Sequence, residues 1–187
     1  MKQFKIFIVL LFICINTFTL TAQIKSGLYL TAQDYINHNL SYTNSNKIQL
    51  NELFASAKIK IIDNGKTISL NKTQIFGYHD KGNNDYRFYK NELYQIIAYQ
   101  PWLVYKGTKL NSLQNGKGGE RKVEYFFSKT QSSELQILST ENLKKTFPDN
   151  LKFHLLLETI KKDNELVYYD SELKRLKVIY LYEQSLK

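Results

Sequence analysis

The chain has 187 residues, and its 26 Lys and Arg outnumber its 17 Asp and Glu, which gives a formal net charge of +9. This length is typical of one domain with a core of its own. The only Met and the only Cys are Met1 and Cys14, so the sequence beyond residue 22 excludes disulfides, thiol nucleophiles and cysteine metal ligands.

Residues 1–22 are predicted to be a secretory signal peptide. Lys2 and Lys5 precede an uncharged apolar run, and small and polar residues then lead to Ala22. This order is typical of export signals, and the run, Ile6 to Ile15, is shorter than the ~20 residues of a membrane-spanning helix. We therefore expect an exported protein, either periplasmic or extracellular at the cell surface.

Cleavage after Ala22 would leave residues 23–187 as a single cysteine-free domain with a net charge of +7 and no membrane span. Leu20-Thr21-Ala22 departs from the small-x-small pattern of a preferred cleavage site, so an uncleaved anchor remains an alternative. Cys14 lies inside the apolar run rather than at its end, which argues against a lipoprotein signal. The lysines of the domain are scattered, and this favours a solvated surface over a nucleic-acid partner.

A short strand followed by a capped helix is predicted at the start of the domain. Gly27–Leu30 has the composition of a strand, and Thr31 and Asp34 have the spacing of a capping box. One or two helical turns should then run to about His38. Residues 39–46 are rich in Asn, Ser and Thr, which predicts a loop.

Residues 57–70 predict a β-hairpin with a defined register. Asn64-Gly65 is a strong hairpin signal, because a type I′ turn needs positive φ at both central positions. A two-residue turn places Asp63 opposite Lys66, and the other pairs follow from the alternation of side chains. These pairs are Ile62 with Thr67, Ile61 with Ile68, Lys60 with Ser69, and Ile59 with Leu70.

A second hairpin is predicted over residues 75–80 and 85–90, around Lys81-Gly82-Asn83-Asn84. The sheet then continues through strands that are separated by Pro101 and by a Gly/Asn/Lys loop at about 108–120. The expected strands are Leu93–Tyr99, Trp102–Lys106, Val123–Ser128 and Leu135–Leu138.

At Thr140 the apolar pattern changes to a helical period. A short helix is expected over Glu141–Thr146, and Pro148 suits the first turn of a second helix, whose apolar residues are Leu151, Leu155, Leu156 and Ile160. From Asp163 onward an apolar stripe predicts one continuous helix of about six turns. The stripe consists of Leu166, Tyr169, Leu173, Leu176 and Tyr180, and it offers a possible homodimer seam as an alternative to packing on the sheet.

These elements predict an α+β domain. An antiparallel meander sheet of about seven short strands should occupy residues 27–139, covered by a C-terminal helical hairpin over residues 140–186. We expect the helices to cover the apolar face of the sheet, because neither layer can bury its apolar residues alone.

Three stretches of the domain stand out together. They are Gly27-Leu28-Tyr29-Leu30-Thr31 with Asp34-Tyr35, Phe76-Gly77-Tyr78 through Asp85-Tyr86-Arg87-Phe88-Tyr89, and Leu138-Ser139-Thr140-Glu141-Asn142-Leu143-Lys144-Lys145 with Phe147-Pro148-Asp149-Asn150. Together they resemble a family of small exported proteins of Bacteroidetes-type bacteria that has no assigned activity. The resemblance covers most of the chain beyond residue 22. It implies an exported, single-domain bacterial protein, and it implies no catalytic residues.

Candidate acid–base residues lie around the second hairpin. The three histidines, His38, His79 and His154, lack the spacing of metal ligands, so we predict no metal and no cofactor. Neighbours on a strand point to opposite faces, so Asp80 cannot readily orient His79, whereas the hairpin can bring Asp85 or Arg87 close to it. His79, Asp80 and Asp85 are the suspects for an alternative function, a hydrolase of envelope or polymer material. No catalytic residue is assigned.

A phosphate-binding loop is not predicted at Gly116-Lys117-Gly118-Gly119. The segment lacks the spacing of a nucleotide-binding loop, and a strand rather than a helix follows it. The N-terminus of a helix is half of the physical mechanism that holds phosphate. We expect a hairpin loop there.

A binding face is predicted at Arg87, Tyr89 and Trp102. All 14 tyrosines lie beyond residue 22, many of them on predicted strands, and tyrosine favours half-buried sheet faces. The leading interpretation is a non-catalytic exported protein that binds through its sheet or through the loop at 108–120. Its partner is a protein, a glycan or an anionic component of the envelope. A lipid- or anion-binding module is a second alternative, because a sheet of about seven strands with a C-terminal helix also describes pleckstrin-homology-like domains.

Overall fold

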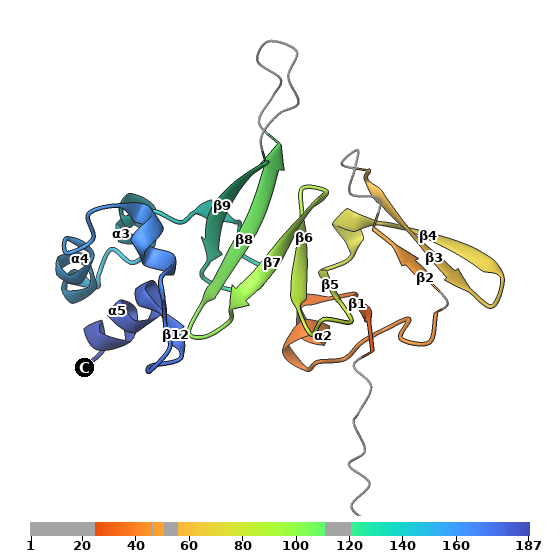
Figure 1. Ribbon diagram of the computed structural model, residues 1–187, viewed down its shortest axis with the longest axis horizontal. Helices are drawn as coiled ribbons and strands as arrows, with labels where there is room; N and C mark the ends of the chain where they lie inside the picture. Colours follow the sequence, from red (N-terminus) through yellow and green to blue (C-terminus); the bar gives the residue numbers. More distant parts are fainter. Residues whose placement is uncertain (1–24, 46, 51–55, 111–120) are drawn as a thin grey trace, which may run out of the picture.

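The computed structural model describes residues 25–45, 47–50, 56–110 and 121–187 (Figure 1). The predicted signal peptide and the loop at Gly116–Gly119 lie outside the described residues. Across the described ranges, no helix combines the length and the apolar character that a membrane crossing requires. The fold is α+β, with an antiparallel sheet and C-terminal helices, so the predicted fold class is confirmed.

Seven antiparallel strands form the main sheet, in the order β1-β5-β6-β7-β8-β9-β10. They are β1 (Gly27–Tyr29), β5 (Gly77–His79), β6 (Asp85–Tyr89), β7 (Glu92–Ala98), β8 (Leu103–Leu110), β9 (Arg121–Ser128) and β10 (Gln136–Ile137). Strands β5 to β10 neighbour one another in chain order, which is the predicted meander. Strand β8 extends to Leu110, so residues 108–110, which we expected in a loop, belong to a strand, and residues 111–120 lie outside the described residues.

The hairpin at residues 57–70 has the predicted register but belongs to a second sheet. It consists of β3 (Lys58–Asp63) and β4 (Lys66–Asn71), and their pairs run from Asp63 opposite Lys66 to Ile59 opposite Leu70. Asn64 and Gly65, between the strands, both have positive φ. Strand β2 (Lys47–Gln49) was not predicted, and it pairs with β3 to make a separate three-stranded sheet.

Helix α2 (Ala32–Ile36) covers the start of the main sheet. Its predicted capping box is present: the Asp34 N–H donates to Thr31 Oγ1 at 3.0 Å, and the Thr31 N–H donates to Asp34 Oδ2 at 2.9 Å. Tyr35, buried on this helix, stacks on Phe76 with 5.1 Å between ring centroids and meets Tyr29 edge-on at 5.3 Å. The cap therefore fixes a helix that closes one end of a layer of aromatic rings.

The C-terminal region contains short elements in place of one long helix. They are α3 (Thr140–Thr146), α4 (Leu151–Leu157), the 3-10 helix η3 (Asp163–Val167), the hairpin strands β11 (Tyr169–Asp170) and β12 (Arg175–Leu176), and α5 (Lys177–Ser185). The prediction of a continuous helix from Asp163 is wrong. Asp170 Oδ1 accepts from the backbone N–H groups of Glu172 and Leu173, both at 2.9 Å, and Lys174 has a positive φ of 52°. Such local hydrogen bonds compete with the backbone hydrogen bonds of a helix. The continuous helix that would have carried the suggested dimer seam is therefore replaced by shorter elements.

Helix α4 also buries a different face from the predicted one. Asn150 caps it, with Oδ1 accepting from the Phe153 N–H at 3.0 Å, so Pro148 precedes the helix rather than occupying its first turn. Leu151 and Leu155 are exposed, whereas Phe153 is buried. The apolar residues of this segment occupy both sides of a short helix, which made the inward face ambiguous.

Buried side chains form three clusters on the two faces of the main sheet. The tyrosine layer consists of Tyr29, Tyr35, Tyr94, Leu103, Tyr105 and Phe126. The C-terminal core joins strand residues Trp102, Val104 and Phe127 to helix-region residues Leu138, Leu143, Phe147, Phe153, Leu157, Leu166, Leu176, Val178, Ile179 and Leu181. The third cluster is Leu28, Ile59, Ile61, Ile75 and Phe88. Because side chains alternate along a strand, the tyrosine layer faces away from the other two clusters. The C-terminal helices and the three-stranded sheet flank opposite ends of the main sheet (Figure 1).

Candidate functional site

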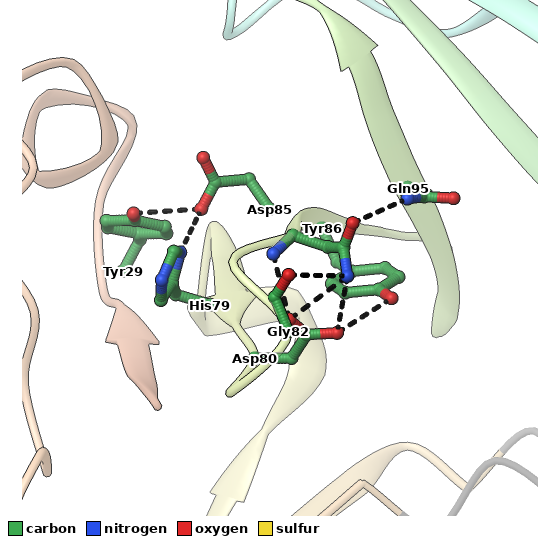
Figure 2. Close-up of polar contacts among 8 residues, drawn as sticks. Tyr29, His79, Asp80, Gly82, Asp85, Tyr86 and Gln95 are labelled. Carbon is green, nitrogen blue, oxygen red and sulfur yellow. Dashed lines mark hydrogen bonds and ion pairs between the residues drawn. The ribbon is translucent and has the colours of Figure 1, made fainter. Parts of the chain in front are cut away.

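The hairpin of β5 and β6 carries the suspected acid–base residues (Figure 2). His79 ends β5 and Asp85 begins β6, and the two lie directly opposite each other in the register. Asp80 is the first residue after β5. The turn therefore places Asp85 beside His79. Of the two predicted carboxylates, it is the one farther away in the sequence that meets His79, and not its sequence neighbour Asp80.

His79, Asp85 and Tyr29 form one hydrogen-bonded group. Asp85 Oδ1 lies 2.7 Å from His79 Nδ1 and accepts from the Tyr29 hydroxyl at 2.9 Å (Figure 2). Burial, followed by the hydrogen bond to Asp85, raises the pKa of Tyr29 well above its usual value, so the hydroxyl remains a donor. The group ties together β1, β5 and β6.

Asp80 belongs to a separate network that shapes the turn. Its Oδ1 accepts from the Asn84 backbone N–H at 2.8 Å, and its Oδ2 accepts from the Tyr86 hydroxyl at 3.1 Å (Figure 2). Partial burial is the largest single effect and raises the pKa of Asp80. The hydrogen bonds from Asn84, Tyr86 and the Gly82 backbone together outweigh burial, so the pKa is lowered. Asp80 thus acts as an ionised acceptor within the turn.

The His79–Asp85 pair supplies two of the three groups of a typical hydrolase. A nucleophile must also lie within hydrogen-bond reach of the free ring nitrogen, Nε2. In the described part of the chain, no hydroxyl makes a hydrogen bond to His79 Nε2. The same residues contain no group of three or more His, Cys, Asp or Glu that could hold a metal ion. What the geometry provides is a link between strands.

Arg87 lies at the centre of β6 with its guanidinium among aromatic rings. Its Cζ atom is 5.6 Å from the ring centroid of Phe76, 5.4 Å from that of Tyr89 and 5.8 Å from that of Tyr105. Arg87 and Tyr89 share one face of the strand, as the alternation predicts. Arg87 is only 6% exposed, so this cation is buried in the tyrosine layer rather than displayed on the surface.

Neutral groups accept the hydrogen bonds of Arg87. Nη1 donates to the Tyr105 hydroxyl at 3.1 Å and to Ser128 Oγ at 3.4 Å, and Nη2 donates to the Ser133 carbonyl oxygen at 2.9 Å. Burial raises the pKa of Tyr105, and the nearby Arg87 offsets only part of this rise, so Tyr105 stays uncharged. Among the residues that the structure describes, no carboxylate forms an ion pair with Arg87.

Trp102 does not belong to the same face. It is 2% exposed and lies in the C-terminal core, with ring centroids 5.6 Å from Phe127, 5.9 Å from Phe147 and 6.1 Å from Tyr182. The prediction that Trp102 joins Arg87 and Tyr89 on one binding face is therefore wrong. Trp102 alternates with Leu103, which faces the tyrosine layer, and the C-terminal helices cover its side of the sheet.

An open groove of about 420 Å³ lies beside Arg87. Its walls come from four segments, Leu30–Ala32, Lys72–Phe76, Arg87–Lys90 and Gln131–Ser132. Among the described lining residues three are basic, namely Lys72, Arg87 and Lys90, and none is acidic. The groove therefore combines positive charge with the rings of Phe76 and Tyr89.

Lys72 and the segment around Ser132 are the parts of this groove that sequence reasoning missed. Lys72 begins the 3-10 helix η2 (Lys72–Gln74), is buried, and donates from Nζ to the Asn91 carbonyl oxygen at 3.2 Å. The other segment reaches the groove through the hydrogen bond between Ser133 and Arg87. Both hydrogen bonds join residues far apart in the sequence, so no local sequence motif predicts either of them.

The chain was compared with protein-family models, with curated proteins and with solved structures, and none of the three comparisons found a match. What the groove does must therefore be inferred from its own shape and charge. The most unusual of its features is that two of its lining cations, Lys72 and Arg87, are buried.

Proposed function

We propose that this is an exported, non-catalytic binding protein of the bacterial envelope whose ligand occupies the groove beside Arg87. The observation that carries this proposal is the groove itself, an open hollow of about 420 Å³ lined by aromatic rings and cations. Concave sites with apolar walls and a few placed polar groups are typical of ligand-binding sites. Export is supported by residues 1–22, which have the order of a signal peptide.

Binding without chemistry is supported by the residues of the groove wall. His is the most frequent general acid or base in enzymes, and Asp, Glu, Cys, Lys and Tyr also serve in that role. The described residues that line the groove include Lys and Tyr but no His, Asp, Glu or Cys. The His79–Asp85 pair is occupied in its own network with Tyr29, so the proposal assigns it a structural role.

The proposal is tested by amide NMR spectra of the protein, recorded while fractions of bacterial envelope extract are added. Binding in the groove should shift the backbone signals of Lys72–Phe76, Arg87–Lys90 and Gln131–Ser132. The same spectra of Tyr89→Ala should show at least a tenfold loss of affinity, because the ring next to the cation is removed. A perturbation that maps to another surface would contradict the proposal.

A matched control and a chemical readout complete this test. Tyr169→Ala removes a tyrosine that is 63% exposed on β11, outside the groove, and should leave the affinity unchanged. Mass spectrometry of the ligand after release should find it unaltered. A ligand that emerges cleaved, with cleavage lost in His79→Ala, would instead establish the hydrolase alternative.

A further inference from the structure

We propose that the ligand of this groove carries a carboxylate or phosphate group that pairs with the guanidinium of Arg87. The inference rests on the proposed function and names the chemistry that the groove recognises. Three observations carry it: a buried cation without a described counter-charge, unused hydrogen-bond donors on that cation, and a groove wall whose described residues carry only basic charges.

The first observation is the uncompensated charge of Arg87. A guanidinium does not lose its proton in proteins, so burial cannot neutralise it. Buried charges are normally paired, because removal from water is costly. The partners of Arg87 in the described structure are two hydroxyls and a backbone carbonyl, all of them uncharged. An anionic ligand would supply the missing charge.

The second observation is that Arg87 has donors to spare. A guanidinium offers five N–H groups, whereas the hydrogen bonds of Arg87 all leave from Nη1 and Nη2. No described residue accepts from Nε. The planar fork of a guanidinium matches the two oxygens of a carboxylate or phosphate. Because Arg87 is part of the groove wall, its unused Nε–H is the donor that we assign to the ligand.

The third observation is the setting of this cation. Lys72 and Lys90 also line the groove, and none of the described lining residues is acidic, so the charges of the described wall favour an anion. Lys90 is exposed, with Nζ 5.2 Å from the Tyr89 ring centroid, and so places a second cation at the rim. The rings of Phe76 and Tyr89 lie 5.6 Å and 5.4 Å from the Cζ atom of Arg87, and both residues offer an apolar wall to the rest of the ligand.

Calorimetry with a matched set of small probes tests the charge requirement. Glucose, glucuronate and glucose 6-phosphate share one sugar ring and differ in the group at one carbon, and inorganic phosphate is the anion alone. We expect at least one charged sugar to bind ten times more tightly than glucose. Preference for glucuronate or for glucose 6-phosphate decides between carboxylate and phosphate, and equal binding of glucose and both charged sugars would overturn the inference.

NMR of the unmodified protein gives a readout that does not depend on a variant folding. The Nε–H resonance of Arg87 should move on addition of the charged probe, and it should stay in place with glucose. Arg87→Lys keeps the charge but loses the planar fork, so the charged probe should bind at least ten times more weakly. Lys60→Gln, which removes an exposed lysine on β3, is the control and should bind as the unmodified protein does. An unmoved Nε–H resonance at saturation would refute the role of Arg87.

The two proposals can fail separately. If a ligand from the envelope extract shifts the groove signals but leaves the Arg87 Nε–H unmoved, the groove binds a ligand and the assigned chemistry is wrong. If charged probes move the Nε–H while the extract ligand maps elsewhere, the anion site stands and the proposed function fails.

Discussion

The C-terminal core and the tyrosine layer pack on opposite faces of β8 and β9, and they are built from different chemistry. The C-terminal core is lined by Leu, Val, Ile and aromatic carbon, and its only buried side-chain nitrogen or oxygen without a hydrogen-bond partner in the described structure is Trp102 Nε1. The tyrosine layer instead contains the hydroxyls of Tyr29 and Tyr105 and the guanidinium of Arg87. The side chains of both clusters are buried, but only the tyrosine layer packs around a charged group.

The contrast between an apolar core and a layer with a buried guanidinium shows which buried groups the stability of the fold requires. Burial of apolar surface stabilises the folded state by roughly 25 cal/mol per Å² and requires only side chains of complementary shape. Buried ionic groups, by contrast, can often be replaced by apolar side chains of similar volume at no cost in stability. Arg87 is therefore hard to explain as a stabilising residue, which is the physical reason for placing the function at the groove and not among the helices.

The largest effect is expected from Phe153→Ala in the C-terminal core. Phe153 is fully buried on α4, with its ring centroid 5.8 Å from that of Phe147 and 5.2 Å from that of Tyr182. Truncation of such a ring leaves a cavity and should lower the free energy of unfolding by about 3–5 kcal/mol. Urea denaturation measures the loss. If the two regions are independent, the affinity of the folded variant for the groove ligand will not change.

Leu155→Ala is the matched control for Phe153→Ala. Leu155 lies on the same helix but is exposed, so its truncation should change the free energy of unfolding by less than about 0.5 kcal/mol. A loss comparable to that of Phe153→Ala would show that α4 buries the face predicted from sequence. A change of ligand affinity in Phe153→Ala would show that the C-terminal core and the groove are coupled.

Gly77→Ala should have a smaller effect on stability and, unlike Phe153→Ala, should also impair the groove. Gly77 lies opposite Arg87, and a Cβ atom there would be 2.1 Å from the Tyr86 carbonyl oxygen. The two strands would have to separate, at a cost of about 1–3 kcal/mol. Urea denaturation, and calorimetry with the charged sugar probes, would measure both losses. Ser69→Ala on the exposed side of β4 should alter neither.

The contrast between regions also explains which elements the sequence could predict. The hairpin of β3 and β4 follows from residues adjacent in the chain, because Asn64-Gly65 sets the turn and alternation sets every pair. Between Asp163 and Tyr180 the helical period is just as regular. There the outcome depends on the side chain of Asp170, which accepts two backbone N–H groups and stops the helix. The period of apolar residues does not reveal a side chain that competes with the helix for backbone hydrogen bonds.

The candidate site was predictable only in part, for a similar reason. Alternation along β6 correctly put Arg87 and Tyr89 on one face. It could not tell that the C-terminal helices cover Trp102, because that depends on contacts with Phe147 and Tyr182. The groove itself arises where segments distant in the chain meet, as in the hydrogen bond between Arg87 and Ser133. The local patterns of a single sequence do not predict such contacts between distant segments.

The smallest effect concerns acid sensitivity, which we expect in the β5–β6 turn and not in the apolar C-terminal core. Hydrogen bonds from Asn84 and Tyr86 outweigh the opposing effect of burial and hold the pKa of Asp80 below its ordinary value of 3.8. A lowered folded-state pKa means that the stabilisation is complete above about pH 4 and is lost as the pH falls through the folded value. Asp80→Asn should therefore lower the free energy of unfolding by about 1 kcal/mol at pH 7 and by progressively less toward pH 2.5. Asp34, whose pKa its hydrogen bonds with Thr31 also lower, titrates in both proteins, so subtracting the two urea-denaturation profiles isolates Asp80. Parallel profiles would mean that the ionised carboxylate of Asp80 does not stabilise the turn.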